Sequence, residues 1–444
     1  MGRWFGQAGK RWRAGMGLAV VTLWVAMPAP ALAGLLSRKH PKAVTADADQ
    51  NKGESTSQPP AASIPVEPLG FFAPGAFYMG LRESLVSLDF LDEERLLFTF
   101  RTPGLIRRKN AADDGERQIR AEVLRLPQGS VESEALWTLH DHDRYLWMLR
   151  DGHFLLRDQE VVKEGDARLG LRSLLQFPGP ILSMAVDPAQ RFLVTNSLEP
   201  SDHKPQAGDV GSPAAAEANV SNESSGSFGQ KDIVVRILER ASGRVMLVSR
   251  VHTTVRLPIN TEGYIETLRG TGQQWILNFD DFTGGSKILA KVDSSCQPPI
   301  DFVSQDEAVA NTCSVDTGRR LVALSMEGEQ LWQAPSPPTQ VWPLLVMAPN
   351  GSRLARETLT LDHAMDGFAH PLDPQDIKGQ VVEVFDAVGG MRVLKVSASP
   401  VLDGGGNVAI SPSGKRVAVL NAGAIQVYDL PPPQVSTLGT KPAH

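Results

Sequence analysis

The sequence of 444 residues has only two cysteines, no excess of positive charge and, after its first 33 residues, no long apolar run. A net charge of −6 gives no basic field of the kind that attracts nucleic acid or anionic lipid, so neither partner is expected. No later stretch reaches the roughly 18 apolar residues of a spanning helix, which predicts no membrane span in the mature chain. We expect the chain to be a monomer.

The motifs of the common catalytic sites are also missing. The sequence has no nucleophile elbow, zinc-protease helix motif, Walker loop, haem attachment motif or EF-hand loop. Catalysis in a fold whose site residues come from separate loops does not need such a motif. The sequence therefore predicts no catalytic residue, no cofactor-binding residue and no cofactor, and it favours binding over catalysis without excluding an enzyme.

The first 33 residues have the three parts of an export signal. Basic residues precede an apolar run from Met16 to Met27, and Ala31, Leu32 and Ala33 fit the small-x-small cleavage pattern. Cleavage near Ala33 predicts a periplasmic or secreted protein. The alternative is an uncleaved membrane anchor, although the apolar run is shorter than the roughly 20 residues of a spanning helix.

The two cysteines, Cys296 and Cys313, both lie in the part expected to be exported. An even number of cysteines in an oxidising compartment predicts a disulfide. On the chain-entropy estimate, a bridge of this length stabilises the fold by about 3 kcal/mol. A redox or metal pair has less support, because there is no Cys-x-x-Cys spacing and no histidine close to either cysteine.

A short unit at residues 407–430 shows the architecture most plainly. It has three apolar runs with a period of two, which indicates three β-strands. The turns between them contain Gly414 and Gly423, which are suited to left-handed backbone positions. Such a meander buries too little surface to be stable alone, so copies of it must stack on one another.

An arginine opens the second strand of this unit, and it recurs in weaker copies. The recurring residues are Arg95, Arg191, Arg353 and Arg416. The intervals between them are 96, 162 and 63 residues, and the last two contain irregular stretches, Pro200 to Gln230 and Thr360 to Lys378. Without these stretches, each step is close to the about 40–45 residues of one propeller blade. The three spacings thus correspond to two, three and one steps, and six steps in all predict seven units.

No segment has the period of an amphipathic helix of three turns, so we expect an all-β fold: a seven-bladed β-propeller of four-stranded antiparallel blades. Pro431, Pro432 and Pro433 cannot donate ladder hydrogen bonds, so the fourth strand of the last blade must come from elsewhere. We expect the stretch from Ala76 to Gly80 to supply it, so that an N-terminal strand closes the ring.

The domain organisation follows from these segments. We expect a signal peptide at 1–33, a disordered linker at 34–66, a propeller domain at 67–432 with insertions at 199–230 and 360–378, and a flexible tail at 433–444. The linker is predicted from its content of Ser, Gln, Pro and Asp without aromatic residues or apolar periodicity.

Residues 411–419 and 425–430 resemble the strand and turn pattern of WD-repeat-like β-propellers of the bacterial, exported kind. Residues 145–147 and 151–157 are similar to segments of proteins of that group. The resemblance covers about residues 80 to 430. It implies the propeller architecture and leaves the function open, because this turn motif occurs in propellers with unrelated roles.

Two polar clusters contain residue types that bind metals. In a strand, the two histidines of residues 140–143 would share one face and could ligate zinc, or this stretch could be a solvated turn. Acidic and imidazole groups in the second insertion could gather around a divalent ion, or remain a solvated loop. The metal candidates are His140, His142, Asp362, His363, Asp366 and His370.

The function best supported by the sequence is an exported, non-catalytic binding or scaffold protein that engages a protein or carbohydrate partner through loops at one end of the ring. The alternative is a metal-dependent hydrolase or lyase with its site at the central channel of the propeller. A third hypothesis is a cell-envelope component that its linker and Pro-rich tail tether to other exported proteins.

Overall fold

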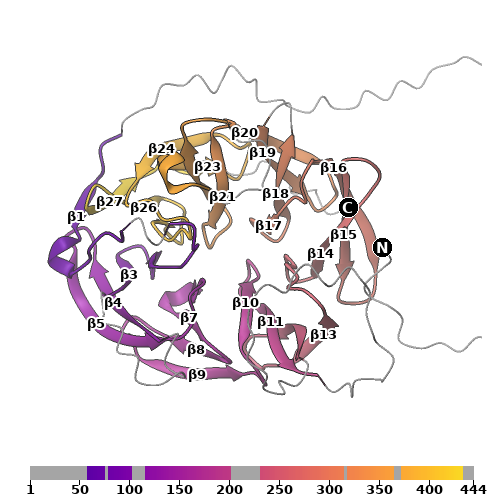
Figure 1. Cartoon of the computed structure of the whole chain (residues 1–444), viewed down its shortest axis with the longest axis horizontal. Coiled ribbons are helices and arrows are strands. Elements are labelled where there is room, and N and C mark those ends of the chain that lie inside the picture. Colours follow the sequence, from indigo (N-terminus) through magenta and orange to yellow (C-terminus); the bar gives the residue numbers. More distant parts are fainter. Residues whose placement is uncertain are drawn as a thin grey trace, which may run out of the picture. The chain divides into compact units, whose positions relative to one another are not determined.

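The computed structural model describes residues 58–75, 79–102, 116–201, 231–314, 318–364 and 372–433, which all belong to one compact unit. Seven antiparallel sheets follow one another around a central cavity, so the predicted all-β, seven-bladed propeller is confirmed (Figure 1). Helical structure in the described residues is limited to short 3-10 turns. Within the same residues, no helix is long and apolar enough to cross a membrane.

With the exception of the fourth, each blade runs from an inner strand beside the cavity to an outer strand. The first three blades are formed by β2 (Val86–Phe90), β3 (Arg95–Arg101), β4 (Arg117–Arg125) and β5 (Ser130–Leu139); β6 (Leu146–Met148), β7 (Phe154–Asp158), β8 (Val161–Gly165) and β9 (Leu171–Gln176); and β10 (Ile181–Val186), β11 (Phe192–Pro200), β12 (Lys231–Glu239) and β13 (Val245–Val251).

The remaining four blades follow the same order. They are formed by β14 (Gly263–Arg269), β15 (Gln274–Asp281) and β16 (Ser286–Asp293); β17 (Ile300–Phe302), β18 (Glu307–Ser314), β19 (Gly318–Ser325) and β20 (Gln330–Ser336); β21 (Gln340–Met347), β22 (Arg353–Leu361), β23 (Ile377–Asp386) and β24 (Arg392–Ala398); and β25 (Val408–Ile410), β26 (Arg416–Asn421), β27 (Ala424–Asp429) and β1 (Ala62–Pro65).

The fourth blade has three regular strands, and an irregular segment, Thr254–Ile259, takes the place of its inner strand. Pro258 has no N–H to donate, but its carbonyl oxygen accepts a hydrogen bond of 2.9 Å from Ile265 N. Ile259 forms a single bridge with Tyr264. This segment lines the cavity as the inner strands of the other blades do.

The ring is closed by an N-terminal strand, as predicted, but the predicted segment is wrong. β1 pairs with β27 in antiparallel register, with Ile64 opposite Ile425, whereas Ala76 to Tyr78 lie outside the described residues. β1 therefore forms within the stretch 34–66 that was predicted to be a linker. Ile64 is 4 % exposed and packs on the backbone of Gly129, where an added Cβ would lie 2.4 Å from Ile64 Cγ2. This tertiary burial selects the strand, since its local sequence carries no strand pattern.

The recurrent arginine has a structural partner that the sequence analysis did not identify. In three blades it forms an ion pair across the sheet with an acidic residue that ends the third strand. The pairs are Arg191 with Glu239, Arg353 with Asp386 and Arg416 with Asp429, at 3.0–3.2 Å. In the first blade the opposite position is Arg125, so Arg95 pairs instead with Asp92 of its own turn, at 2.6 Å.

The core lies between consecutive blades. Trp137 packs on Phe154 of the second blade with ring centroids 5.6 Å apart, and Trp332 stacks on Phe385 of the sixth blade at 6.4 Å. The predicted disulfide between Cys296 and Cys313 is present and ties the segment before β17 to the end of β18. Gly414 and Gly423 have φ values of 71° and 77°, as the turn prediction requires.

Several predicted segments lie outside the described residues. These are the signal peptide at 1–33, residues 34–57 of the predicted linker, residues 434–444 of the tail, and the inner parts of both insertions, 202–230 and 365–371. The second insertion is shorter than predicted, because β22 continues to Leu361 and β23 already begins at Ile377.

Candidate functional site

The two ends of the ring differ in what they carry. Since strands alternate in direction, every inner strand begins at one end, and every connection between a second and a third strand lies at that same end. We call this end the entry face; it carries Arg82, Arg144, Trp342 and Gly405 at the cavity. Both predicted insertions leave from this face, because β11 and β22 end there.

The central cavity has a volume of about 1390 Å³ and is lined by all seven blades. Its lining contains both charged and apolar side chains, but no histidine and no cysteine among the described residues. A nucleophile activated by a neighbouring imidazole is therefore not formed by the described lining residues. The charged lining residues are Arg82, Asp89, Asp143, Arg144, Asp187, Arg256, Asp301 and Glu357.

Arg144 immediately precedes the inner strand of the second blade. Its guanidinium lies over the ring of Trp147, 5.3 Å from the ring centroid, and its Nε donates a 3.1 Å hydrogen bond to Leu146 O. Among the described residues, its two terminal nitrogens have no hydrogen-bond or ion-pair partner. Arg144 is thus a fixed cation in the cavity lining, with two terminal nitrogens unpaired in the described residues.

The protein surrounds Arg144 without neutralising it directly. Burial within the propeller lowers the pKa of Arg144, and the charges of Asp89 and Asp301 oppose this effect. Asp89 accepts a 2.6 Å hydrogen bond from Ser87 Oγ. Desolvation raises the pKa of Asp89 to about 6, against the hydrogen bond from Ser87 and the charge of Arg144. Asp301 forms an ion pair with Arg256.

A second arginine and tryptophan meet between the sixth and first blades. The Arg82 guanidinium lies 4.7 Å from the ring centroid of Trp342, and both residues have positive φ values, 53° and 50°. Asp403 Oδ2 fixes the Arg82 backbone, since it accepts hydrogen bonds from Gly80 N at 2.5 Å and Arg82 N at 3.1 Å. Positive φ at non-glycine residues is held only by such surrounding contacts.

Glu357 of β22 is a buried acid at the cavity wall. It is 1 % exposed, and its Oε1 accepts a 2.6 Å hydrogen bond from Gln380 Nε2. Burial raises the pKa of Glu357 to about 8, so the carboxyl group is mostly protonated at pH 7. With Oε1 accepting from Gln380, Oε2 is the oxygen available to carry the proton and to donate it in a hydrogen bond.

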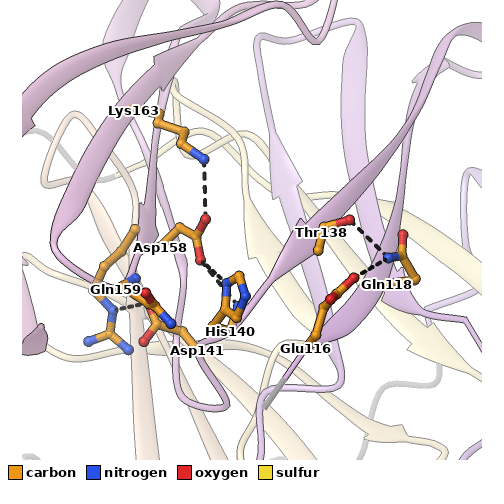
Figure 2. A network of polar contacts seen from close by, with 9 residues as sticks. Glu116, Gln118, Thr138, His140, Asp141, Asp158, Gln159 and Lys163 are labelled. Atoms are coloured by element: carbon orange, nitrogen blue, oxygen red, sulfur yellow. Dashed lines mark hydrogen bonds and ion pairs between the residues drawn. The ribbon is translucent and has the colours of Figure 1, made fainter. Parts of the chain in front are cut away.

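The first pair of metal candidates does not converge. Figure 2 shows His140 beside Asp158, with 3.2 Å between His140 Nδ1 and Asp158 Oδ1, and Lys163 on the other carboxylate oxygen. His142 instead lies 3.3 Å from Glu83, measured between Nδ1 and Oε1. The two imidazoles thus contact different carboxylates, and zinc binding by this pair stays a prediction.

The second group of metal candidates comes together in part. Ligand atoms of Asp362, His363 and Asp376 lie within 4.8 Å of one another, the one such cluster that the described residues form. Asp362 is already engaged by His363 Nδ1 at 2.6 Å and by Lys378 Nζ at 3.1 Å, and these two contacts lower the pKa of Asp362. Asp366 and His370 lie outside the described residues, so metal binding here also stays a prediction.

The sequence analysis missed the residues that line the entry face. Two signals were available. Arg356 and Glu357 are consecutive charged residues inside an otherwise buried strand, and Gly404, Gly405 and Gly406 form a run of three glycines. Buried charged residues and runs of glycine both lower the stability of a fold, so their presence indicates that packing or a site requires them.

Comparison with known proteins yields only solved structures of low similarity. No family model matches this sequence, and no curated protein matches it. The chain is similar to the C-terminal WD40 domain of Sif2, at 12% identity over 79% of this chain and 96% of that domain, with a TM-score of 0.41. It is also similar to oligogalacturonate lyase in complex with manganese, at 12% identity over 78% and 96% of the two chains, with a TM-score of 0.39.

A third similar structure is the acylaminoacyl peptidase of Pyrococcus horikoshii. The identity is 8%, the matched region is 79% of this chain, and the TM-score is 0.44. This chain spans about half of that enzyme, 53% of its length. Identities and scores at this level carry no function across.

Proposed function

We propose that this protein is a non-catalytic binding module that holds an anionic group of a protein or carbohydrate partner at the entry face. The observation that carries this proposal is the Arg144 guanidinium, fixed over Trp147 beside a large cavity with two terminal nitrogens unpaired in the described residues. An unpaired, pre-positioned guanidinium supports recognition of a carboxylate, sulfate or phosphate through two parallel hydrogen bonds.

The surroundings of Arg144 favour binding of an anion over a permanent internal ion pair. Stacking on Trp147 restricts the side chain before a partner arrives, which reduces the entropy lost on binding. Asp89 stabilises the cation at longer range, and its own charge is lost as the pH falls through about 6. Anion binding is therefore expected to strengthen at mildly acidic pH and to weaken with added salt.

The alternative is a metal-dependent hydrolase or lyase acting at the channel. The described lining offers carboxylates such as Asp89 and Asp301, but the cluster of metal-binding residue types lies elsewhere, at Asp362, His363 and Asp376. Elemental analysis of the purified protein distinguishes the two functions. Stoichiometric zinc, calcium or manganese would favour the enzyme.

We also propose that the protein is exported. The basic start, the apolar run and the cleavage pattern near Ala33 support this proposal, and a disulfide between Cys296 and Cys313 is compatible with an oxidising compartment. Mass spectrometry of the mature protein from the source cells tests it. A mature chain that begins at Gly34 is expected, and a retained leader in a cytosolic fraction would contradict it.

Site-specific photocrosslinking in intact cells tests the binding face. A photoreactive residue replaces Leu81, which is 53 % exposed beside Arg82, and in a matched control it replaces Leu136, which is 62 % exposed on the outer strand β5. Crosslinks that form from position 81 and are lost when Arg144→Ala is added are expected. Equal crosslinking from both positions, unaffected by Arg144→Ala, would overturn the proposal.

A further inference from the structure

The geometry points to a second recognition element in the same cavity: a carboxylate-binding pocket formed by Glu357, Arg82 and the backbone of Gly404 to Gly406. This inference deepens the proposed function, and it rests on that function only in assigning the bound carboxylate to a partner. The pocket lies at the entry face between the sixth, seventh and first blades, and the described residues that form it all line the central cavity.

Glu357 presents an unused group to this pocket. Its Oε1 is held by Gln380, whereas its Oε2 has no hydrogen-bond partner among the described residues. The Oε2 atom lies beside Gly405, where an added Cβ would be 3.3 Å away. A side chain that is 1 % exposed, with one oxygen facing a cavity and unpartnered, indicates a missing ligand group.

The three glycines bring the backbone close to Glu357 and Arg82. A Cβ on Gly404 would lie 2.5 Å from Glu83 O and 2.9 Å from Arg82 O, and a Cβ on Gly405 would lie 2.6 Å from Leu344 Cδ1. Side chains are therefore excluded from this turn. Within the described residues, the N–H groups of Gly404 and Gly406 have no hydrogen-bond partner, so they are further donors at the pocket.

Arg82 supplies the positive charge. Its backbone is fixed by Asp403 and lies against Gly404, and its guanidinium, stacked on Trp342, makes no ion pair with the described residues. A protonated carboxyl, a guanidinium and amide N–H groups are all donors. Such a set fits a ligand with two acceptor oxygens and a negative charge, namely a carboxylate such as a chain terminus, an acidic side chain or a uronic acid.

The protonation of Glu357 sets the pH range in which the pocket works. The elements packed around it present neutral groups, Leu344 of β21, Gln380 of β23 and Gly405, and the charged residues at the margin are Arg82 and Asp403. Burial alone raises the pKa of Glu357 to about 8. Above that pH, the carboxyl becomes an anion that repels a ligand carboxylate, so affinity falls as the pH rises through about 8.

The probe that tests the pocket is N-acetylglycine, with N-acetylglycinamide as its uncharged control. Backbone amide resonances of residues 404–406 are followed by NMR during titrations of the full chain at pH 6.5 and pH 9. We expect N-acetylglycine to shift these resonances at pH 6.5, to bind at least about 10-fold more tightly than the amide, and to lose about 10-fold in affinity at pH 9.

Two variants test whether position 357 acts as a hydrogen-bond donor to the ligand. Glu357→Gln keeps a donor at the same position, so it should bind at both pH values with little difference. Glu357→Met removes the donor and should weaken binding about 10-fold at pH 6.5. Three results would contradict the proposed pocket. These are equal affinities for N-acetylglycine and N-acetylglycinamide, a loss of affinity at pH 9 that persists in Glu357→Gln, and unchanged binding of N-acetylglycine by Glu357→Met.

Failure of the pocket and failure of the binding module give different results. If N-acetylglycine perturbs only the indole resonance of Trp147, the pocket is wrong and anion binding at Arg144 stands. If residues 404–406 respond while Arg144→Ala has no effect on crosslinking from position 81, the pocket stands and the proposed role of Arg144 is wrong.

Discussion

Gln380 Nε2 donates a 2.6 Å hydrogen bond to Glu357 Oε1, and the two side chains are only 2 % and 1 % exposed. The same amide donates to Leu402 O at 2.9 Å, and its oxygen accepts from Leu402 N at 2.8 Å and from Asn407 Nδ2 at 2.9 Å. This network joins the sixth blade to the segment that leads into the seventh. It holds Glu357 at the cavity wall, where burial favours the neutral form of the carboxyl group.

The neutral form of Glu357 predicts a pH-dependent effect of Glu357→Gln on stability. The pKa is about 8 in the folded protein and 4.5 in the reference state, so the folded state keeps a proton that the unfolded state has lost. The contribution of Glu357 to the free energy of unfolding of the wild type is therefore fully present below pH 4.5 and is lost as the pH rises to about 8. Between pH 5 and pH 8, the stability of Glu357→Gln relative to wild type should rise by roughly 3–4 kcal/mol.

Urea unfolding of both proteins at several pH values measures this difference. Glu307→Gln is a matched variant, because burial also raises the pKa of Glu307, to about 7. The stability that Glu307→Gln gains over wild type should reach its full size at a lower pH than for Glu357→Gln. A difference between Glu357→Gln and wild type that stays constant from pH 5 to pH 8 would show that Glu357 is not held protonated.

One buried side-chain hydrogen bond joins the first and second blades. Thr99 Oγ1 and Tyr145 OH are 2.7 Å apart, and both residues are fully buried. Tyr145→Phe leaves the Thr99 hydroxyl unpaired and should lower the free energy of unfolding by about 1–3 kcal/mol. In denaturant melts, Thr99→Val combined with Tyr145→Phe should cost less than the two single changes added together. Strict additivity would indicate that the two hydroxyls do not interact.

The repeated architecture could be predicted from sequence because it depends on local patterns. Period-two apolar runs and turn glycines such as Gly414 and Gly423 specify hairpins wherever they occur. The spacing of the recurring arginine predicted the number of blades. Its acidic partners, such as Glu239 for Arg191, lie at the end of the following strand and were not needed for that prediction. The disulfide was predictable because the chain has only two cysteines.

The closing strand and the entry face could not be predicted in the same way. β1 has four residues and becomes a strand only because β27 offers it a free edge and Gly129 makes room for Ile64. Arg82, Arg144 and Glu357 come from three blades, and their common position follows from ring closure, which no local pattern contains. Glu357 was the most accessible of these, since a charged residue inside a buried strand signals a constraint.

Truncation tests which segment closes the ring. A chain that begins at Gln58 retains β1, whereas a chain that begins at Glu67 lacks it but keeps the segment from Ala76 to Gly80. The shorter chain should lose about 2–4 kcal/mol of stability, as expected from removing the buried Ile64 side chain and the pairing with β27. Thermal unfolding of the two chains measures the loss. Equal melting temperatures would instead favour closure by residues 76–80.

The disulfide between Cys296 and Cys313 closes a loop with a sequence separation of 17 residues. Replacing both cysteines with serine should lower the free energy of unfolding by about 3 kcal/mol. Unfolding under reducing conditions provides the control, because reductant should destabilise the wild type and leave the double variant unchanged. A double variant as stable as the oxidised wild type would show that the bridge adds nothing to stability.

The central claim, anion binding at Arg144, is tested most directly by calorimetric titration with an acetylated tetraglutamate peptide and with tetraglutamine as the neutral control. Arg144→Ala should weaken tetraglutamate binding at least about 10-fold, whereas Arg244→Ala, at a 60 % exposed arginine side chain on the outer rim, should leave it unchanged. Equal affinities of the two variants, or equal binding of tetraglutamine by the wild type, would contradict the account.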